Sequence, residues 1–114
     1  MKINILSVYE SGAVDAWFWN VYIAKNPSGT YSAEMIQTAE NVSSQADCYE
    51  PFTSKEFTLA SDLFNFISSS WYEVHEEHLS LEDWREIAAE ATHLDPVLAA
   101  KLMEFATDWY VAEE

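Results

Sequence analysis

The first half of the chain alternates hydrophobic and polar positions with the two-residue period of β-strands. Residues 3–9 are rich in Ile, Val and Tyr, and Ile3, Ile5 and Ser7 are expected on one face. Residues 16–25 and 31–40 alternate in the same way, so the pattern predicts three strands. In residues 16–25, one side carries Trp17, Trp19, Val21 and Ile23 and the other carries Phe18, Asn20 and Tyr22. In residues 31–40, one side carries Tyr31, Ala33 and Met35 and the other carries Ser32, Glu34, Ile36 and Thr38.

Residues 26–30 read Asn-Pro-Ser-Gly-Thr between the second and third predicted strands. Pro27 presets its φ angle and Gly29 permits a positive φ, so this composition predicts a turn that joins the two strands as an antiparallel hairpin. Residues 41–51 are polar and show no apolar period, so we expect a loop there. Residues 55–58 are compatible with a short further strand.

The second half changes to the three- and four-residue spacing of amphipathic helices. Thr58 or Ser61 is expected to cap the first helix, and Ser80 the second, with Asp83 completing a capping box. A third helix is predicted to begin at Asp95, because Pro96 suits the first helical position. The apolar stripes are Ala60, Phe64, Ile67, Trp71 and Val74; Leu81, Trp84, Ile87, Ala88 and Ala91; and Leu98, Leu102, Phe105 and Trp109.

This order of elements predicts an α+β fold. We expect residues 1–114 to form a single domain, with an N-terminal antiparallel sheet of about three strands in residues 1–57. About three helices in residues 58–114 are expected to pack on one face of that sheet. Strands that precede helices, rather than alternate with them, argue against a doubly wound parallel sheet.

The chain is strongly acidic, with a formal net charge of -15 that arises from 20 acidic and 5 basic residues. Thirteen of the acids fall in residues 58–114, where only Arg85 and Lys101 oppose them. Direct binding of DNA or RNA phosphates needs clustered Lys and Arg, so this charge excludes it and also argues against an anionic membrane surface. The one cysteine, Cys48, cannot form an intramolecular disulfide, and no apolar run approaches the ~20 residues of a membrane span. We expect a cytoplasmic protein.

A row of carboxylates is the main candidate site. Glu82, Glu86 and Glu90 recur every four residues, so at ~1.5 Å rise per residue they lie about 6 Å apart along one side of a helix. That spacing roughly matches every second phosphate of a DNA strand, where phosphates repeat about every 3.4 Å. The further candidate partner-binding residues are Asp83, Glu76, Glu77 and Glu73. The alternative is a solvated face without a ligand.

A small acidic α+β domain with acid rows on its helices resembles the inhibitors that phages and mobile elements encode, the anti-CRISPR and anti-restriction proteins that mimic DNA. The resemblance covers size, charge and layout, without a diagnostic motif. It implies a stoichiometric inhibitor of a CRISPR–Cas effector or related nuclease, bound at the basic nucleic-acid surface. Some inhibitors of that kind instead block a conformational change. The alternatives are an immunity protein against a nuclease toxin and a non-inhibitory acidic adaptor subunit.

Enzymatic features are weak. His75 and His78 stand three residues apart on a predicted helix and could share a metal with a carboxylate, yet the spacing is not that of HExxH. Only two glycines occur, so the chain has no glycine-rich phosphate loop. We therefore expect a protein that is not an enzyme and carries no metal or cofactor. Its oligomeric state is open, and the aromatic candidates for an exposed rim are Tyr49, Phe52, Tyr72 and Tyr110.

Overall fold

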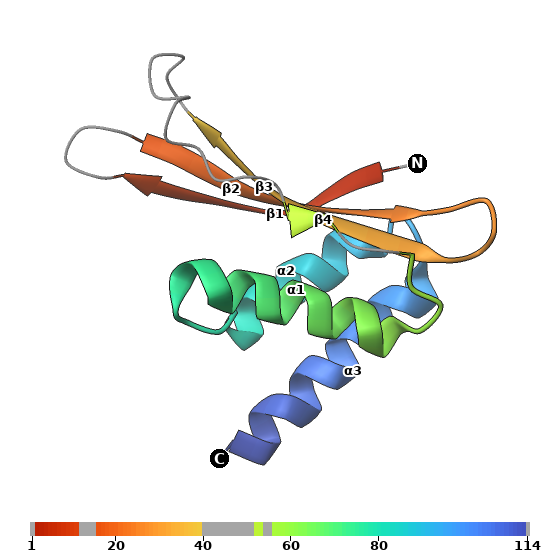
Figure 1. Cartoon of the computed structure of the whole chain (residues 1–114). Coiled ribbons are helices and arrows are strands. Elements are labelled where there is room, and N and C mark those ends of the chain that lie inside the picture. Colours follow the sequence, from red (N-terminus) through yellow and green to blue (C-terminus); the bar gives the residue numbers. More distant parts are fainter. Residues whose placement is uncertain (1, 12–15, 40–51, 54–55, 114) are drawn as a thin grey trace.

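A computed structural model describes residues 2–11, 16–39, 52–53 and 56–113. Its sheet is antiparallel, with the spatial order β1-β2-β3-β4 (Figure 1). The strands are β1 (Lys2–Ser11), β2 (Ala16–Lys25), β3 (Tyr31–Ala39) and β4 (Phe52–Thr53). The three predicted strands are confirmed, and the two-residue β4 is an addition that pairs with the outer edge of β3.

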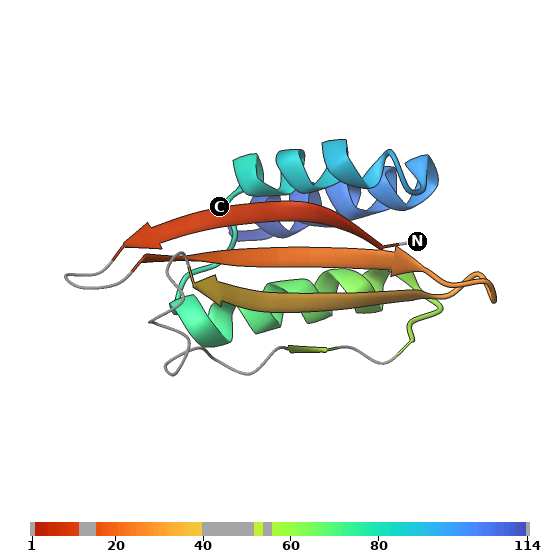
Figure 2. The same ribbon diagram turned by 90° about the horizontal axis from the view of Figure 1, so that it is seen from above.

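The helices cover one face of the sheet, as predicted for an α+β fold (Figures 1 and 2). They are α1 (Ala60–His75), α2 (Leu81–Ala91) and α3 (Pro96–Glu113). Helix α2 packs against β1, helix α1 packs against β3, and α3 contacts both helices. In Figure 1 the C-terminal part of α3 points away from the sheet. Within the described ranges, no helix is both long and apolar enough to traverse a lipid bilayer.

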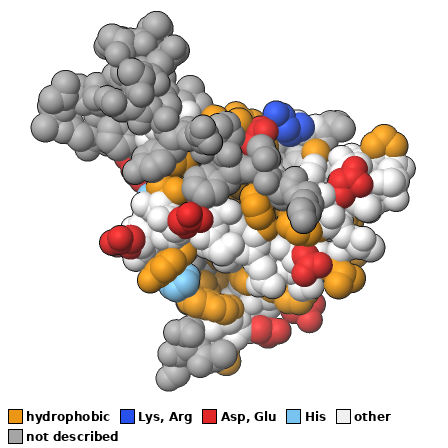
Figure 3. All heavy atoms as spheres, in the orientation of Figure 1, with side chains coloured by type: hydrophobic (Ala, Val, Ile, Leu, Met, Phe, Trp, Pro, Cys, Tyr) orange, Lys and Arg blue, Asp and Glu red, His pale blue; other side chains and the backbone are white. Residues whose placement is uncertain are grey.

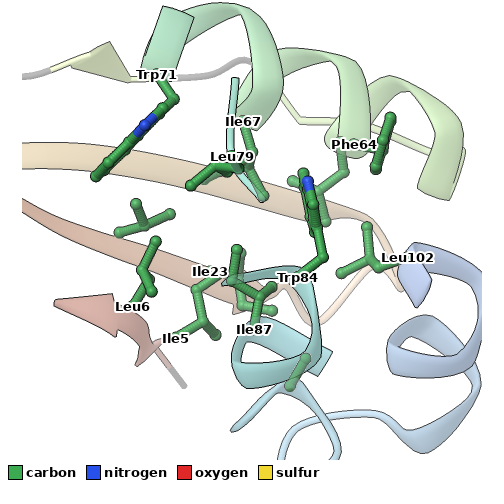
Figure 4. Close-up of a cluster of buried hydrophobic side chains, with 14 of the residues drawn as sticks. Ile5, Leu6, Ile23, Phe64, Ile67, Trp71, Leu79, Trp84, Ile87 and Leu102 are labelled. Carbon is green, nitrogen blue, oxygen red and sulfur yellow. The ribbon is translucent and has the colours of Figure 1, made fainter. Parts of the chain in front are cut away.

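The core forms between the sheet and the helices, and the predicted alternation accounts for its sheet side. Trp19 and Val21 of β2 are almost completely buried, whereas Phe18 on the opposite face is exposed. In Figure 4 aliphatic side chains of β1 and β2 point toward aromatic and aliphatic side chains of the helices. The largest fully buried side chains are Trp19, Val21, Ile5, Ile23, Leu63, Ile87, Leu98 and Leu102.

Strand β1 contains a bulge that changes which residues face the core. Its pairing with β2 shifts register between Asn4 and Leu6, so Ile5 and Leu6 are both buried although they are adjacent. The Asn4 side-chain oxygen accepts the backbone N–H of Leu6 at 3.0 Å and supports the bulge. The expectation that Ser7 shares a face with Ile3 and Ile5 is therefore wrong. Ser7 is exposed, because one extra residue moves every later side chain to the other face.

The predicted hairpin turn between β2 and β3 is confirmed. Gly29 has a φ of 86°, a left-handed conformation that glycine adopts without strain. The Gly29 N–H donates to the Asn26 carbonyl at 2.9 Å, and the Asn26 N–H donates to the Thr30 carbonyl at 2.8 Å. Of the short strand expected at residues 55–58, residues 56–58 contain only an isolated antiparallel bridge, which pairs Phe57 with Tyr31 at the start of β3. Lys55 and the loop predicted at residues 41–51 lie outside the described residues.

Helix ends follow local sequence only in part. Ser80 caps α2 in a complete capping box with Asp83, as predicted. Helix α1 instead begins after Leu59, which provides no side-chain cap, so the expectation of Thr58 or Ser61 is wrong. Helix α1 also ends earlier than expected, because Glu76 adopts a left-handed conformation with a φ of 57°.

Asp95 caps α3, as predicted, and also ties that helix to the sheet. Its Oδ1 accepts the N–H groups of Val97 and Leu98 at 3.0 and 3.2 Å. Its Oδ2 accepts from Lys25 at 3.1 Å and from the Tyr31 hydroxyl at 2.8 Å. Burial alone would raise the pKa of Asp95, but the hydrogen bonds from Tyr31, Lys25 and Leu98 and the charge of Lys25 lower that pKa to about 2. The carboxylate is thus charged and fully engaged with the protein.

Candidate functional site

The acid row predicted on α2 faces solvent. Glu82, Glu86 and Glu90 are all exposed, while Trp84 and Ile87 of the same helix are buried in the core. The division follows from the helical period, which leaves residues four apart on one side. The helix therefore presents three carboxylates to solvent in one row.

No ion pair within the described ranges neutralises this row. The two lysines of β1 and β2 are engaged elsewhere, since Lys2 lies 3.0 Å from Glu34 and Lys25 lies 3.1 Å from Asp95. A further close contact joins His75 Nε2 to a carboxylate oxygen of Glu10, 2.7 Å apart. All of these pairs involve at least one residue of the sheet. Within the described ranges the carboxylates of the α2 row therefore have no ion-pair partner, although Arg85 is exposed on the same helix.

Two members of the row border a hollow of about 460 Å³ beside the edge strand β1. Glu86 and Glu90 supply its acidic side, and residues 4–7 of β1 supply the other side. Figure 2 shows α2 running alongside β1 at this border of the sheet. A partner that reaches the carboxylates would therefore also meet polar groups of β1, where Asn4 and Ser7 are exposed.

The other predicted partner-binding residues lie in different local surroundings. Asp83 accepts the backbone N–H of Ser80 at 2.9 Å, so its carboxylate serves the helix cap. Glu76 and Glu77 are exposed in the connection between α1 and α2. Glu73 belongs to α1 and lines a different hollow. Burial and the charge of Asp83 both raise the pKa of Tyr110. The Asp83 carboxylate therefore lies near this residue of α3.

A larger groove of about 890 Å³ lies on the side of the molecule formed by α1 and α3. Figure 3 shows hydrophobic side chains across this face, with carboxylates around them. Aromatic rings supply most of its lining, and Asp62 and Glu73 are its two acids. The lining residues are Phe57, Phe64, Phe66, Tyr72, Leu79, Trp84 and Trp109, with Asp62, Asn65, Ser68, Ser69, Glu73 and His78.

This groove is absent from the sequence predictions, which assign Phe64, Trp84 and Trp109 to the core. The assignment is correct for Phe64 and Trp84, which are 8% and 2% exposed, but one surface of each ring also borders the groove. Phe66 and Tyr72 lie off the predicted stripe of α1, which is the sequence signal for a second apolar face. Tyr72 is 47% exposed, as expected for a rim residue.

The remaining rim candidates have different outcomes. Tyr110 is half-buried and packs against the core, so it is less exposed than the sequence analysis expects of a rim residue. Tyr49 and the side chain of Phe52 lie outside the described residues. On the open face of the sheet, Tyr9 and Phe18 are exposed and meet edge to face with 5.2 Å between ring centroids.

The two histidines considered as metal ligands have separate environments. His75 is the last residue of α1 and His78 follows the helix, so they do not occupy one helical face as expected. The His75 ring stacks on Trp71, with Nδ1 3.1 Å from the Trp71 carbonyl oxygen. The His78 ring stacks on Tyr72 instead. Across the described residues, no three His, Cys, Asp or Glu side chains are grouped as they would be to hold a metal ion.

Comparison of the chain with protein-family models, with curated proteins and with solved structures found no match. The surfaces described above are therefore the basis for an assignment of function.

Proposed function

We propose that this protein is an inhibitor that binds the basic nucleic-acid-binding surface of an enzyme, in the manner of anti-CRISPR or anti-restriction proteins. The target class is a CRISPR–Cas effector or a related nuclease. The inhibitor acts by binding rather than by catalysis, uses no cofactor, and meets its target in the cytoplasm. Glu82, Glu86 and Glu90 take the place of backbone phosphates in the target's Lys/Arg-lined groove.

The observation that carries this proposal is the exposed and unneutralised row on α2. Glu82, Glu86 and Glu90 repel one another along the helix, at a cost of roughly 0.2–0.5 kcal/mol for each i,i+4 pair. Solubility would be served equally well by a mixture of Lys and Glu, which would stabilise the helix. Arg85 is the only base in α2, and a ligand role for the row accounts for how little mixing there is.

The field of the whole chain supports the same interpretation. A net charge of -15 on 114 residues would steer association with a cationic surface and raise its rate. The lysines that pair with acids belong to β1 and β2, and neither pairs with the α2 row, which leaves the α2 side of the molecule available to a basic partner. Binding would then weaken as salt rises, because the screening length falls from ~8 Å at 0.15 M to ~3 Å at 1 M.

The test begins with capture of the partner on the immobilised protein and its identification by mass spectrometry. The captured protein is then purified, and its binding to duplex or guide nucleic acid is titrated with the inhibitor. We expect competitive loss of nucleic-acid binding near one equivalent. An immunity protein would instead abolish the activity of a nuclease toxin, and an adaptor would leave nucleic-acid binding intact.

Two charge-matched variants make the test specific for the surface. The first carries Glu82→Lys, Glu86→Lys and Glu90→Lys. The second carries Glu56→Lys, Glu104→Lys and Asp108→Lys, three exposed acids outside the row. We expect the first variant to lose inhibition and the second to retain most of it. Equal inhibition by both variants, with circular dichroism showing that both are folded, would remove the α2 row as the contact surface.

A further inference from the structure

The groove beside α1 has a regular geometry along that helix. Asp62, Asn65, Phe66, Ser69 and Glu73 recur every three or four residues, so they lie along one face of α1. Asp62 is in the first turn and Glu73 is in the last turn. Their separation of eleven positions corresponds to ~16 Å of helix at ~1.5 Å per residue. The groove is thus about three helical turns long, with a carboxylate toward each end.

The walls of the groove are aromatic and already packed. The rings of Phe64 and Trp84 stack with 4.5 Å between centroids. At the other end, His78 lies between Tyr72 and Trp109, with centroid distances of 4.6 and 4.7 Å. These contacts hold the rings in place without a ligand, so a ligand would not have to order them. A preformed apolar site of several hundred cubic ångströms matches the usual dimensions of binding pockets.

The charges along the lining define the chemistry of an occupant. Asp62 and Glu73 are exposed, and no lysine or arginine lines the groove. A matching ligand is apolar in its middle and positive at both ends. A second copy of this chain would place acids against acids if the two grooves faced each other, which disfavours self-association at this site.

The backbone around the groove further limits the form of a peptide ligand. Most lining residues belong to α1, α2 or α3, where helical hydrogen bonds occupy the backbone groups. An extended peptide would find no strand edge to pair with along α1. A helix needs no such pairing, because its own backbone hydrogen bonds are internal.

We propose that the groove between α1 and α3 binds an amphipathic α-helix of a partner protein. That helix carries large aliphatic or aromatic anchors along one face and Lys or Arg near both ends, about eleven residues apart. The anchors fill the groove over Phe64, Phe66 and Trp84, and the basic residues face Asp62 and Glu73. This site is separate from the α2 row and does not rest on the function proposed for it.

The test uses a synthetic fifteen-residue helical peptide as the probe. It has leucines at i, i+3, i+4 and i+7 and lysines eleven residues apart at its ends, and a second peptide has glutamates in place of the lysines. Binding is followed by fluorescence anisotropy and by the indole N–H resonances of ¹⁵N-labelled tryptophan. We expect the basic peptide to bind and to shift the Trp84 and Trp109 signals, and the acidic peptide to bind at least about tenfold more weakly.

Charge reversal at the rim provides the specific test. The variant with Asp62→Lys and Glu73→Lys should lose about tenfold in affinity for the basic peptide and gain affinity for the acidic one. The matched variant with Glu104→Lys and Asp108→Lys changes the net charge equally, but neither residue lines the groove. Equal affinity of both variants for both peptides would overturn the proposal. So would a concentration-dependent dimer in sedimentation equilibrium that Tyr72→Ala abolishes, because the occupant would then be a second copy.

Discussion

The Tyr31 hydroxyl donates a 2.8 Å hydrogen bond to Oδ2 of Asp95 and so joins the start of β3 to the start of α3. The two residues are 64 positions apart in the sequence. Lys25 reaches the same oxygen from the end of β2. One carboxylate therefore caps a helix and fixes that helix to the hairpin.

Removal of the tyrosine hydroxyl should destabilise the fold. We expect Tyr31→Phe to lower the free energy of unfolding by about 1–2 kcal/mol, because the lost hydrogen bond has a charged acceptor in a mostly buried position. Urea denaturation measures the change. Tyr72→Phe is the matched control, since Tyr72 is exposed and should give a change within about 0.5 kcal/mol. Equal effects of the two substitutions would contradict the structural role of Tyr31.

The depressed pKa of Asp95 predicts a pH-dependent contribution to stability. Its pKa is 3.8 in the absence of these contacts and about 2 in the fold, so the folded state favours the charged form. The contribution is complete above about pH 5 and disappears as the pH falls from about 4 to about 2. A shift of this size corresponds to about 2–2.5 kcal/mol.

Comparison with Asp95→Asn isolates this contribution from that of the other acids. The difference in unfolding free energy between the two proteins should shrink by about 1–2 kcal/mol between pH 5 and pH 2. Urea titrations at several pH values provide the measurement. A difference that stays constant over this range would mean that the ionised form of Asp95 is not what stabilises the fold.

The helix starts at Ser80 and Asp95 can be predicted from sequence because a cap depends on residues only a few positions away. The same is true of the hairpin turn, where Gly29 supplies the positive φ. The bond from Tyr31 to Asp95 cannot be predicted in this way, since it depends on how α3 docks against the hairpin. The groove is hidden for the same reason, because Phe66 and Trp109 become neighbours of one hollow only after α1 and α3 pack together.

The β1 bulge marks the limit of period-based prediction within a single strand. Strict alternation puts Ile5 and Ser7 on one face, but the adjacent apolar pair of Ile5 and Leu6 already departs from that period. Both side chains reach the core because the chain gains one residue relative to β2. An adjacent apolar pair is not by itself a signal for a bulge, since Met35 and Ile36 of β3 are also consecutive and pair with β2 without a register shift.

Asn4 should matter more than its exposure indicates. Its side chain accepts the Leu6 N–H at 3.0 Å and donates to Ser7 Oγ at 2.9 Å, so it supports the bulge from both directions. We expect Asn4→Ala to lower the free energy of unfolding by about 1 kcal/mol. Amide exchange at Leu6 should accelerate at the same time, because its N–H loses its acceptor. Unchanged exchange at Leu6 would show that the bulge does not depend on Asn4.

A double-mutant cycle can measure the contact between Glu10 of β1 and His75 at the end of α1. The two atoms lie 2.7 Å apart, and the His75 side chain is only 12% exposed. We expect a coupling energy of about 1–2 kcal/mol between Glu10→Ala and His75→Ala. The His75→Ala substitution also removes the stacking between His75 and Trp71. This loss occurs both with and without Glu10→Ala, so it cancels in the cycle. Additive single effects would mean that the pair does not hold α1 against β1.

The acid row makes a prediction in which stability and binding change in opposite directions. Glu86→Lys removes two like-charge i,i+4 pairs, with Glu82 and Glu90, and replaces them with attractive ones. We expect the free energy of unfolding to rise by about 1 kcal/mol, as measured by urea denaturation. Glu86→Gln, which removes only the repulsion, should give about half of that gain.

The same Glu86→Lys substitution should weaken binding to a basic partner, because it places a cation in the middle of the row. A solvated face without a ligand would show the gain in stability and no loss of binding, since nothing would contact the row. The combination of greater stability with weaker inhibition therefore separates a ligand surface from a merely hydrated one. That outcome would also explain why the chain keeps a helix face whose charges oppose its own folding.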